Sequence, residues 1–252
     1  MIFNKEKYLQ RINYSGNPEP DLNILSTLQK QHLLSVPFEN LDIHHNVPIK
    51  LSIENIFNKV VNQNRGGFCY ELNGLFYELL NAIGFDVKMV SARVFDQDKG
   101  YGEEYDHLAI ITRINNIEYL TDVGFGEFTF KPLKLQLGTV QKDQRGNFKI
   151  DKFKNGYLKV SKIENEKSTP EYIFKNKERE LKEFEEMCVF HQTSSDSPFT
   201  SKRLITLPTE NGRVTISGNT LKIKELETTA ELTLKNEAEY EEELWNRFNI
   251  KI

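Results

Sequence analysis

The chain has 252 residues, of which 38% are hydrophobic and 28% are charged, and its formal net charge is −4. This is the composition of a globular protein with a sizeable core, and it gives no reason to expect a nucleic acid or an anionic membrane as partner. The two cysteines, Cys69 and Cys188, do not have the spacing of a disulfide framework, and no membrane-spanning run or signal peptide is apparent. We therefore expect a cytoplasmic protein.

The first part of the chain, residues 1–84, is expected to be mostly helical. Apolar residues recur at helical spacing over residues 22–34, which predicts a helix. This helix is expected to end before Pro37, because proline disfavours a helical residue before it. The clearest helix is predicted over residues 72–83, where apolar side chains follow the spacing i, i+3, i+4, i+7 and i+8. Gly84 then occupies the position at which glycine commonly ends a helix.

After the helices the hydrophobic period changes to two, which is typical of strands. An antiparallel sheet or barrel is predicted over residues 85–165, followed by a return to helical spacing over residues 176–190. A hairpin is predicted over residues 214–223, and an acidic amphipathic helix over residues 237–248. Helices followed by strands and then by a mixed unit indicate an α+β fold.

A cysteine at the start of the clearest helix is the main candidate for catalysis. Residues 65–69 read Arg-Gly-Gly-Phe-Cys, so that two glycines precede Cys69 and the helix follows it. Unpaired backbone N–H groups and the positive end of the helix dipole favour a thiolate over a thiol at this position. Taken alone, the segment is equally consistent with a buried, inert cysteine.

A base for this cysteine can be placed from the register of a predicted hairpin. The pair Asn115–Asn116 suits a two-residue turn, because asparagine tolerates a positive φ. Pairing the residues that flank the turn places His107 opposite Gly124 and makes Asp122 its diagonal neighbour on the same face. Asp122 could then accept a hydrogen bond from one imidazole nitrogen while the other nitrogen faces a thiol. Singly, His107 could solvate a sheet edge and Asp122 could cap a turn.

Other chemically active residues give weaker signals. His32, on a leucine-rich helix, and Cys188, in an apolar stripe, are expected to be structural, whereas His191 before a Ser/Thr loop is a candidate ligand contact. A metal site needs three or four convergent ligands, and no Cys-x-x-Cys or His-x-x-x-His pattern occurs, so no metal is expected. The Gly-Phe-Gly segment at residues 124–126 lacks the spacing of a phosphate-binding loop.

The chain resembles the arylamine N-acetyltransferases. The matching motifs, in chain order, are Pro-Phe-Glu-Asn-Leu (37–41), Arg-Gly-Gly-Phe-Cys-Tyr-Glu-Leu-Asn (65–73), His-Leu-Ala (107–109), Asp-Val-Gly-Phe-Gly (122–126), His-Gln-Thr (191–193) and Ser-Pro-Phe (197–199). The Arg-Gly-Gly-Phe-Cys segment is the most specific of them, and the resemblance covers most of the chain. One departure is Asn249, where the resemblance leads us to expect glycine.

The resemblance implies a three-part α+β fold with a catalytic core of the cysteine-protease and transglutaminase type. Its parts would be a helical bundle carrying the nucleophile (1–84), an antiparallel β-barrel carrying His and Asp and ending in an interdomain helix (85–190), and an α/β lid (191–252). The catalytic nucleophile, base and orienting acid would be Cys69, His107 and Asp122. The residues expected to line the substrate site are Phe38, Phe68, Phe125, Gly124 and Gly126.

The resemblance also implies the reaction and the small molecules that take part in it. Acetyl-coenzyme A (acetyl-CoA) would be the donor and cosubstrate, and arylamines, arylhydrazines or arylhydroxylamines the acceptors, as in xenobiotic metabolism. We expect a two-step, ping-pong transfer through an acetyl-cysteine, in a monomer or a weak homodimer. Two alternatives stay open: a transglutaminase-like thiol hydrolase or amidase with the same Cys-His-Asp order, and a non-catalytic binding protein on the same fold.

Overall fold

The computed structural model describes residues 3–252, and contacts in space group the chain into two compact units. The first unit comprises Met1–Ser15, Gln31–Phe68 and Cys188–Ile252, and the second comprises Gly16–Lys30 and Cys69–Met187. Each unit therefore combines segments that are distant in the sequence. The division into three consecutive parts stays a prediction.

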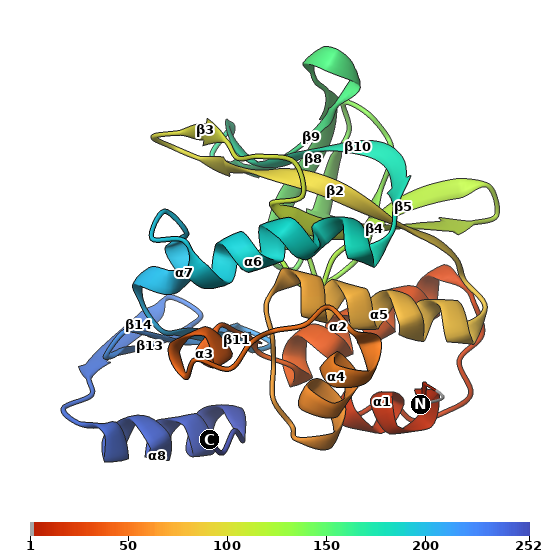
Figure 1. Ribbon diagram of the computed structural model, residues 1–252. Coiled ribbons are helices and arrows are strands. Elements are labelled where there is room, and N and C mark those ends of the chain that lie inside the picture. The colour runs from red at the N-terminus through yellow and green to blue at the C-terminus, as the bar shows by residue number, and fades with distance from the viewer. Residues whose placement is uncertain (1–2) are drawn as a thin grey trace. The chain divides into compact units, whose positions relative to one another are not determined.

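The second unit is built on an antiparallel sheet. Within the described residues its nine strands are β2 (Asp86–Asp96), β3 (Gly100–Tyr101), β4 (His107–Ile114), β5 (Ile117–Thr121), β6 (Leu133–Lys134), β7 (Val140–Asp143), β8 (Gly146–Lys152), β9 (Leu158–Glu164) and β10 (Lys167–Arg179). Their order is β6-β5-β4-β2-β10-β9-β8-β7, and the short β3 pairs with β2. A bridge between Leu137 and Ile150 joins the chain after β6 to β8, so the sheet curls into a nearly closed barrel (Figure 1). The predicted sheet is confirmed.

The barrel interior is filled by the residues that alternate along each strand. Val90 and Ala92 of β2 and Ala109 and Ile111 of β4 are fully or almost fully buried in one apolar cluster. Alternate residues of a strand point to opposite faces, so a period of two in the sequence becomes a packed inner face here. Burying each larger aliphatic or aromatic side chain contributes about 1.5–3 kcal/mol.

Helix α5 (Cys69–Ile83) belongs to the same unit and lies against β4 and β2 (Figure 1). The helix predicted over residues 72–83 is confirmed, and it begins one turn earlier than the apolar pattern indicated. Gly84 adopts φ +104° and its N–H donates to the carbonyl of Leu80 at 3.2 Å. That left-handed conformation explains why glycine ends the helix.

The prediction of a helix over residues 176–190 placed its start too early. Glu178 and Arg179 still belong to β10, where they pair with Val90 and Met89 of β2. The chain then enters a 3₁₀ turn, η3 (Leu181–Phe184), whose N-cap Glu180 forms a capping box, and continues as α6 (Glu185–Thr193). Sheet pairing therefore overrides the local helical spacing.

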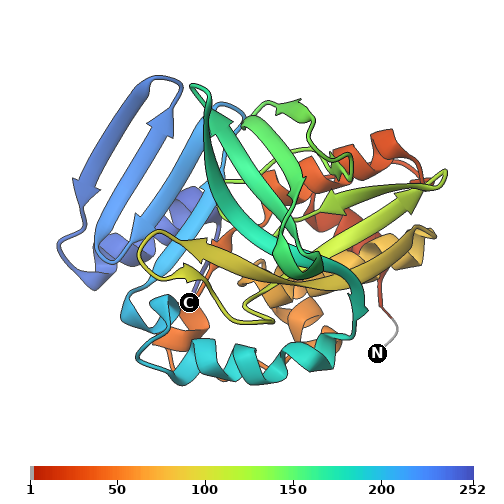
Figure 2. The same cartoon turned by 90° about the horizontal axis from the view of Figure 1, so that it is seen from above.

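The first unit combines short helices with a second sheet. Its helical segments are α1 (Lys5–Arg11), α3 (Leu41–His44), α4 (Ile53–Phe57), the π-helix η1 (Asn58–Asn62), α7 (Pro198–Ser201) and α8 (Glu237–Phe248). Helices α2 (Leu22–Ser35) and α6 each have residues in both units. Its strands are β1 (Phe38–Glu39), β11 (Leu204–Pro208), β12 (Gly212–Ser217), β13 (Thr220–Glu225) and β14 (Thr228–Thr233), in the order β1-β11-β12-β13-β14. Figure 2 shows β11–β14 side by side in blue.

Helix α8 covers one face of this sheet with three buried residues, Tyr240, Leu244 and Phe248. The predicted hairpin and the predicted helix over residues 237–248 are both confirmed, whereas β11 and β14 were not anticipated. Asn249 ends α8 with φ 53° and ψ 37°. This is the left-handed position that favours glycine and, after it, asparagine, which accounts for the departure from the expected residue.

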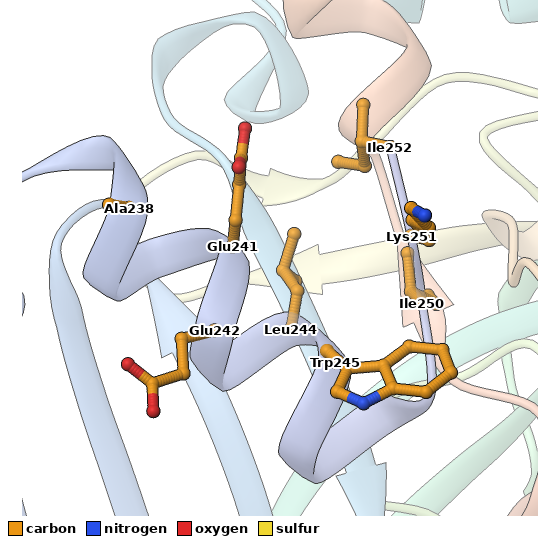
Figure 3. A pocket seen from close by; sticks show the side chains of 8 residues that line it. All are labelled: Ala238, Glu241, Glu242, Leu244, Trp245, Ile250, Lys251 and Ile252. Atoms are coloured by element: carbon orange, nitrogen blue, oxygen red, sulfur yellow. The ribbon is translucent and has the colours of Figure 1, made fainter.

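The C-terminal residues fold back along α8 and form a pocket of about 460 Å³ (Figure 3). Trp245, Ile250 and Ile252 supply much of its apolar lining, with Glu241 and Glu242 at its edge. The pocket lies in the first unit and contains none of the predicted catalytic residues. Across residues 3–252 the structure has no helix that is both long and apolar enough to cross a bilayer.

Candidate active site

Cys69 is the first residue of α5, so its N–H lies at the positive, N-terminal end of the helix. The side chain is buried, with 4% of its surface exposed, and the sulfur is not in a disulfide. The chain just after β5 packs directly on this residue. A Cβ atom on Gly124 would lie 2.8 Å from Cys69 Cα, so only glycine permits the observed approach.

His107 and Asp122 form a buried hydrogen-bonded pair in the same unit as Cys69. Nε2 of the imidazole lies 2.7 Å from Oδ2 of Asp122, and the two side chains are 2% and 0% exposed. The predicted register of the hairpin is confirmed: the ladder runs from the Ile114–Ile117 pair to the Ile110–Thr121 pair and ends one residue before Asp122. The predicted contact therefore forms at the open end of the hairpin, where the carboxylate is free of the ladder.

Asp122 has four hydrogen-bond partners, which together fix both of its oxygens. Oδ1 accepts from Asn73 Nδ2 at 2.8 Å and from the Gly124 N–H at 2.9 Å. Oδ2 is bonded to His107 and also accepts from the Tyr172 hydroxyl at 3.1 Å. A buried carboxylate held in this way cannot rotate, so it orients the imidazole and keeps Nδ1 on the side away from the acid.

Asn73 joins the cysteine helix to this carboxylate. It lies one helical turn after Cys69, and its amide nitrogen donates to both Asp122 and the carbonyl of Leu108, the latter at 2.6 Å. Its amide oxygen accepts from the Val123 N–H at 2.9 Å. One buried side chain therefore sets the position of α5 relative to β4 and to the segment after β5.

Comparison with known proteins identifies the family. Residues 21–252 match the N-acetyltransferase family. Arylamine N-acetyltransferase 1 of Homo sapiens is 33% identical over 273 residues, covering 98% of this chain and 94% of the human protein. The chain belongs to the arylamine N-acetyltransferase family. It is therefore an enzyme, and its class is acyltransferase.

Two solved arylamine N-acetyltransferases share the fold of this chain. The enzyme from Bacillus cereus, which has a Cys-His-Glu catalytic triad, is 26% identical with a TM-score of 0.92 over 100% of both chains. The enzyme from Mycobacterium marinum in complex with CoA is 29% identical with a TM-score of 0.89, over 98% of this chain and 93% of that one. The predicted α+β fold of this acetyltransferase is thereby confirmed.

Aromatic rings enclose the imidazole of this acetyltransferase. Phe125 lies 5.2 Å from the His107 ring and 5.1 Å from the Tyr172 ring, measured between centroids, and Phe128 packs behind both Phe125 and Tyr172. Burial, and then the nearby Asp122 carboxylate, raise the pKa of Tyr172 well above its usual value. Its hydroxyl therefore stays protonated and remains a hydrogen-bond donor to Asp122.

The other predicted substrate-binding residues have different surroundings. Phe38 and Phe68 belong to the first unit, where their rings lie 5.9 Å and 6.1 Å from Phe199. Gly124 packs on the cysteine helix, whereas Gly126 is exposed and a Cβ there would meet nothing within 4 Å. The structure thus brings Phe125 to the His–Asp pair, and the substrate-binding role of all five residues stays a prediction.

Arg65, four residues before the cysteine, belongs to a buried ion cluster in the first unit. Its guanidinium contacts Glu39 and Asp42 at 2.8 Å, and Lys59 contacts Asp42 at 2.8 Å and Glu39 at 4.0 Å. Burial alone would raise the pKa of Asp42, but Lys59 and Arg65 lower it overall. Gly66 follows within contact of Pro37, since a Cβ at that position would fall 2.0 Å from the Pro37 carbonyl oxygen.

His32, His191 and Cys188 each have a protein partner away from the His107–Asp122 pair. His32 is fully buried and lies 2.8 Å from the Tyr8 hydroxyl, and burial lowers its pKa to about 3. His191 is bonded to the Ser197 hydroxyl at 3.0 Å. Cys188 is buried beside Gln192, whose amide also bonds the backbone of Ile49. From residue 3 onward the structure has no group of three or more side chains suited to a metal ion.

Two residues of the site were not assigned a role from the sequence. Asn73 stood within a recognised motif, and its position four residues after the cysteine, on the same face of the predicted helix, is a signal that could have identified it. Tyr172 had no such signal. It follows Pro170 in a segment that had not been predicted as a strand.

Proposed function

We propose that this enzyme transfers an acetyl group from acetyl-CoA to an aromatic amine, hydrazine or hydroxylamine, in two steps through an acetyl thioester on Cys69. The observation that carries this proposal is the buried His107–Asp122 pair at 2.7 Å, beside the start of the helix that begins with Cys69. The proposed roles are nucleophile for Cys69, base for His107 and orienting acid for Asp122. A Cys-His-Glu triad in the B. cereus relative supports a Cys-His-acid order.

The first step transfers the acetyl group to sulfur. Because Nε2 of His107 is bonded to Asp122, Nδ1 is the nitrogen available to take the Cys69 proton. The thiolate attacks the carbonyl carbon of acetyl-CoA, the new carbon–sulfur bond forms, and the bond to the CoA sulfur breaks. The imidazolium returns its proton to the departing CoA thiolate. Asp122 stabilises the imidazolium that exists between these two events.

The oxyanion of the tetrahedral intermediate requires fixed hydrogen-bond donors. The Cys69 N–H is one candidate, because it belongs to the residue that carries the sulfur and lies at the N-terminal end of α5. The helix dipole adds a partial positive charge at the same end. Both effects stabilise developing negative charge without any movement of the protein.

The second step releases the acetyl group to the acceptor. The amine nitrogen attacks the thioester carbon, His107 accepts a proton from that nitrogen, and the carbon–sulfur bond to Cys69 breaks. His107 then returns the proton to sulfur, which restores the starting enzyme. An arylamine is a neutral nucleophile at pH 7, so no prior deprotonation is needed. Phe125, in ring contact with His107, supplies an apolar surface suited to the acceptor ring.

The donor assignment rests on two supports. A structural neighbour from M. marinum has been solved in complex with CoA. The chemistry also fits, because a thioester has a good leaving group and suits a soft sulfur nucleophile. The physiological acceptor belongs to the broad class of aromatic nitrogen nucleophiles.

A single-turnover experiment tests the scheme. The enzyme is mixed with acetyl-CoA in the absence of any amine, and the intact protein is analysed by mass spectrometry while released CoA is titrated. We expect one acetyl group on Cys69 and a burst of one equivalent of CoA. Cys188→Ala is the matched control because it removes the other buried thiol and should retain the adduct, whereas Cys69→Ala should lose it. Release of CoA without any acetylated enzyme would exclude the covalent step.

A further inference from the structure

A second pocket, on the outer face of the barrel, combines aromatic rings with cationic side chains. It has a volume of about 330 Å³. Its lining consists of Arg93, Tyr101, Phe153, Lys154, Asn155, Tyr157 and Ile173. All of these residues belong to the second unit, so the pocket is a property of that unit alone. No carboxylate side chain is part of its wall.

The strand register adds two more cations to this face. Ile173 of β10 pairs with Arg93 of β2 on one side and with Lys159 of β9 on the other, and directly paired residues share a face. Lys175 is two residues further along β10, and its Nζ lies 4.5 Å above the Tyr157 ring. Arg93, Lys154, Lys159 and Lys175 therefore gather on one face. Within residues 3–252 none of the four forms an ion pair, so their charges are not neutralised by a protein carboxylate.

Two carboxylates beside these cations are Glu104 and Asp151; Asp151 lies opposite Lys159 in the ladder and forms an ion pair with Lys149. Glu104 accepts hydrogen bonds from the hydroxyls of Ser91, at 2.9 Å, and of Tyr157. The guanidinium of Arg93 instead donates to the carbonyl of Gly102 at 2.5 Å, and a carbonyl leaves its positive charge in place. The four cations outnumber Glu104 and Asp151, so this face keeps a net positive charge.

The aromatic part of the pocket is a pair of rings beside the cations. Tyr101 and Phe153 contact each other at 5.2 Å between centroids, and Nζ of Lys154 lies 5.7 Å from the Phe153 ring. Both rings are partly exposed. Exposed aromatic surfaces accept the flat face of a nucleobase, and adjacent Lys and Arg side chains bind phosphate.

The pocket also lies near the triad along the same strands. Arg93 is next to Ala92, which pairs with His107, and Ile173 is next to Tyr172, which bonds Asp122. Successive residues point to opposite faces, so the pocket and the His–Asp pair lie on opposite faces of the same end of the barrel. A long, flexible ligand could therefore place its charged end in the pocket and its other end near the triad.

We infer that this pocket binds an adenine nucleotide, with the base on Tyr101 and Phe153 and the phosphates on Arg93, Lys154 and Lys175. If the nucleotide is the adenosine bisphosphate end of the donor, the inference rests on the proposed function. A free adenine nucleotide carries the same chemistry. The two sources differ in whether occupation of the pocket excludes acetyl-CoA.

The test uses matched charge reversals in the full chain. The pocket variant is Lys154→Glu with Lys175→Glu, and the control is Lys142→Glu with Lys167→Glu, which changes the net charge equally on exposed residues outside the pocket. Transfer is measured with acetyl-CoA and with p-nitrophenyl acetate, an acyl donor without a nucleotide. Phe153→Ala tests the aromatic part in the same assays.

We expect the ratio of kcat/KM for acetyl-CoA to that for p-nitrophenyl acetate to fall about tenfold in the pocket variant and in Phe153→Ala. The control variant should keep the wild-type ratio. Adenosine 3′,5′-bisphosphate, titrated by calorimetry, should bind the wild type and the control more tightly than the pocket variant. Equal ratios and equal titrations in all variants would overturn the inference.

The same titrant separates the two sources. Competition with acetyl-CoA identifies the pocket as the nucleotide end of the donor site, whereas pocket-dependent binding to enzyme saturated with acetyl-CoA identifies a site for a free nucleotide. Failure of the proposed function looks different, because neither donor would then acetylate Cys69. The wild-type reaction with p-nitrophenyl acetate thus reports on the triad independently of the pocket.

Discussion

Two buried polar networks involve residues at or near the two ends of the Arg-Gly-Gly-Phe-Cys segment, and they are built differently. In the first unit, Glu39 and Asp42 meet Lys59 and Arg65, so that two carboxylates face two cations. In the second unit, Asp122 is held by an amide, a backbone N–H, a hydroxyl and the imidazole of a histidine. The first network cancels its charges, whereas the second retains a negative charge.

The difference separates a structural network from the proposed catalytic one. A neutral cluster of ion pairs has no charge left over to stabilise a transition state, but each member is expensive to remove because its partner then stays buried and unpaired. A carboxylate held by neutral donors is equally well fixed, and its charge remains available to a protonated imidazole. Loss of a charge should therefore affect stability in the first network and catalysis in the second.

The largest expected effect is on catalysis, from Asp122→Asn. The amide would place an N–H against Nε2 of His107 and so favour the wrong tautomer, and we expect kcat to fall by about 10⁴-fold, as for the same change in a serine-protease triad. The measurement is steady-state transfer from acetyl-CoA to an arylamine, together with chemical denaturation.

Asp143→Asn is the matched control for that variant. The Asp143 carboxylate accepts the backbone N–H groups of Phe130 and Lys131, both at 3.0 Å, and has no contact with His107. This variant should lose some stability and keep most of its activity. The distinction between the networks fails if Asp122→Asn loses stability in proportion to its activity.

Arg65→Met should have the next largest effect, on stability. The substitution leaves Glu39, whose side chain is 0% exposed, with the Lys59 ammonium at 4.0 Å and the Leu41 N–H at 2.7 Å, and breaking a buried ion pair in this way costs about 3–5 kcal/mol. The free energy of unfolding, measured with urea, reports the loss. Arg113→Met is the control, because its pairs with Asp86 and Glu118 are solvent-exposed and worth at most about 1 kcal/mol. Equal losses of unfolding free energy in the two variants would show that the buried cluster stabilises the protein no more than an exposed ion pair does.

The contact between His107 and Asp122 in the second network could be predicted because it depends on local signals. The Asn115–Asn116 turn fixes the register, since both residues adopt positive φ, and the register alone brings His107 to Asp122. Cys69 could likewise be placed at the start of a helix from the apolar spacing after it. The catalytic roles of these residues remain a proposal that the experiments above address.

The other parts of the two networks depend on packing over long sequence distances. Tyr172 follows Pro170 in β10, and the register shifts between them, so the bulge hides the alternation that marks a strand. The partners of Arg65 lie more than twenty residues upstream, on β1 and α3, and no local pattern pairs them. Strands β11 and β14 were missed for the same reason, because pairing with β12 and β13 stabilises them.

A third carboxylate, Glu171 at this bulge, differs from both networks because it is partly buried without partners that compensate its charge. Burial raises its pKa to about 7; Lys162 opposes the shift, and Glu127 and Glu164 add to it. Between pH 4.5, the ordinary pKa of this group, and about pH 7, the folded protein binds more protons than the unfolded chain. The stability contributed by this group is therefore lost as the pH rises through that window.

Glu171→Gln removes this pH dependence. Relative to the wild type, we expect the variant to be more stable by about 1–3 kcal/mol at pH 8.5 and nearly equal near pH 4.5. Urea denaturation at the two pH values gives the comparison. A constant difference between variant and wild type across this range would mean that Glu171 is ionised in both states and that its surroundings resemble water.

The smallest expected effect comes from Tyr172→Phe, which removes one neutral donor from Asp122 and leaves the ring in place. A hydrogen bond of about 1 kcal/mol corresponds to about a fivefold decrease in kcat. Tyr172 does not reach the reacting atoms through its hydroxyl, so it acts by positioning the carboxylate, and KM for the arylamine should change little. Because its pKa lies well above the usual value, the effect should be the same from pH 6 to pH 9. If kcat were unchanged while stability fell, the hydroxyl would belong with the structural network, and the carboxylate would need only Asn73 and Gly124 to hold its orientation.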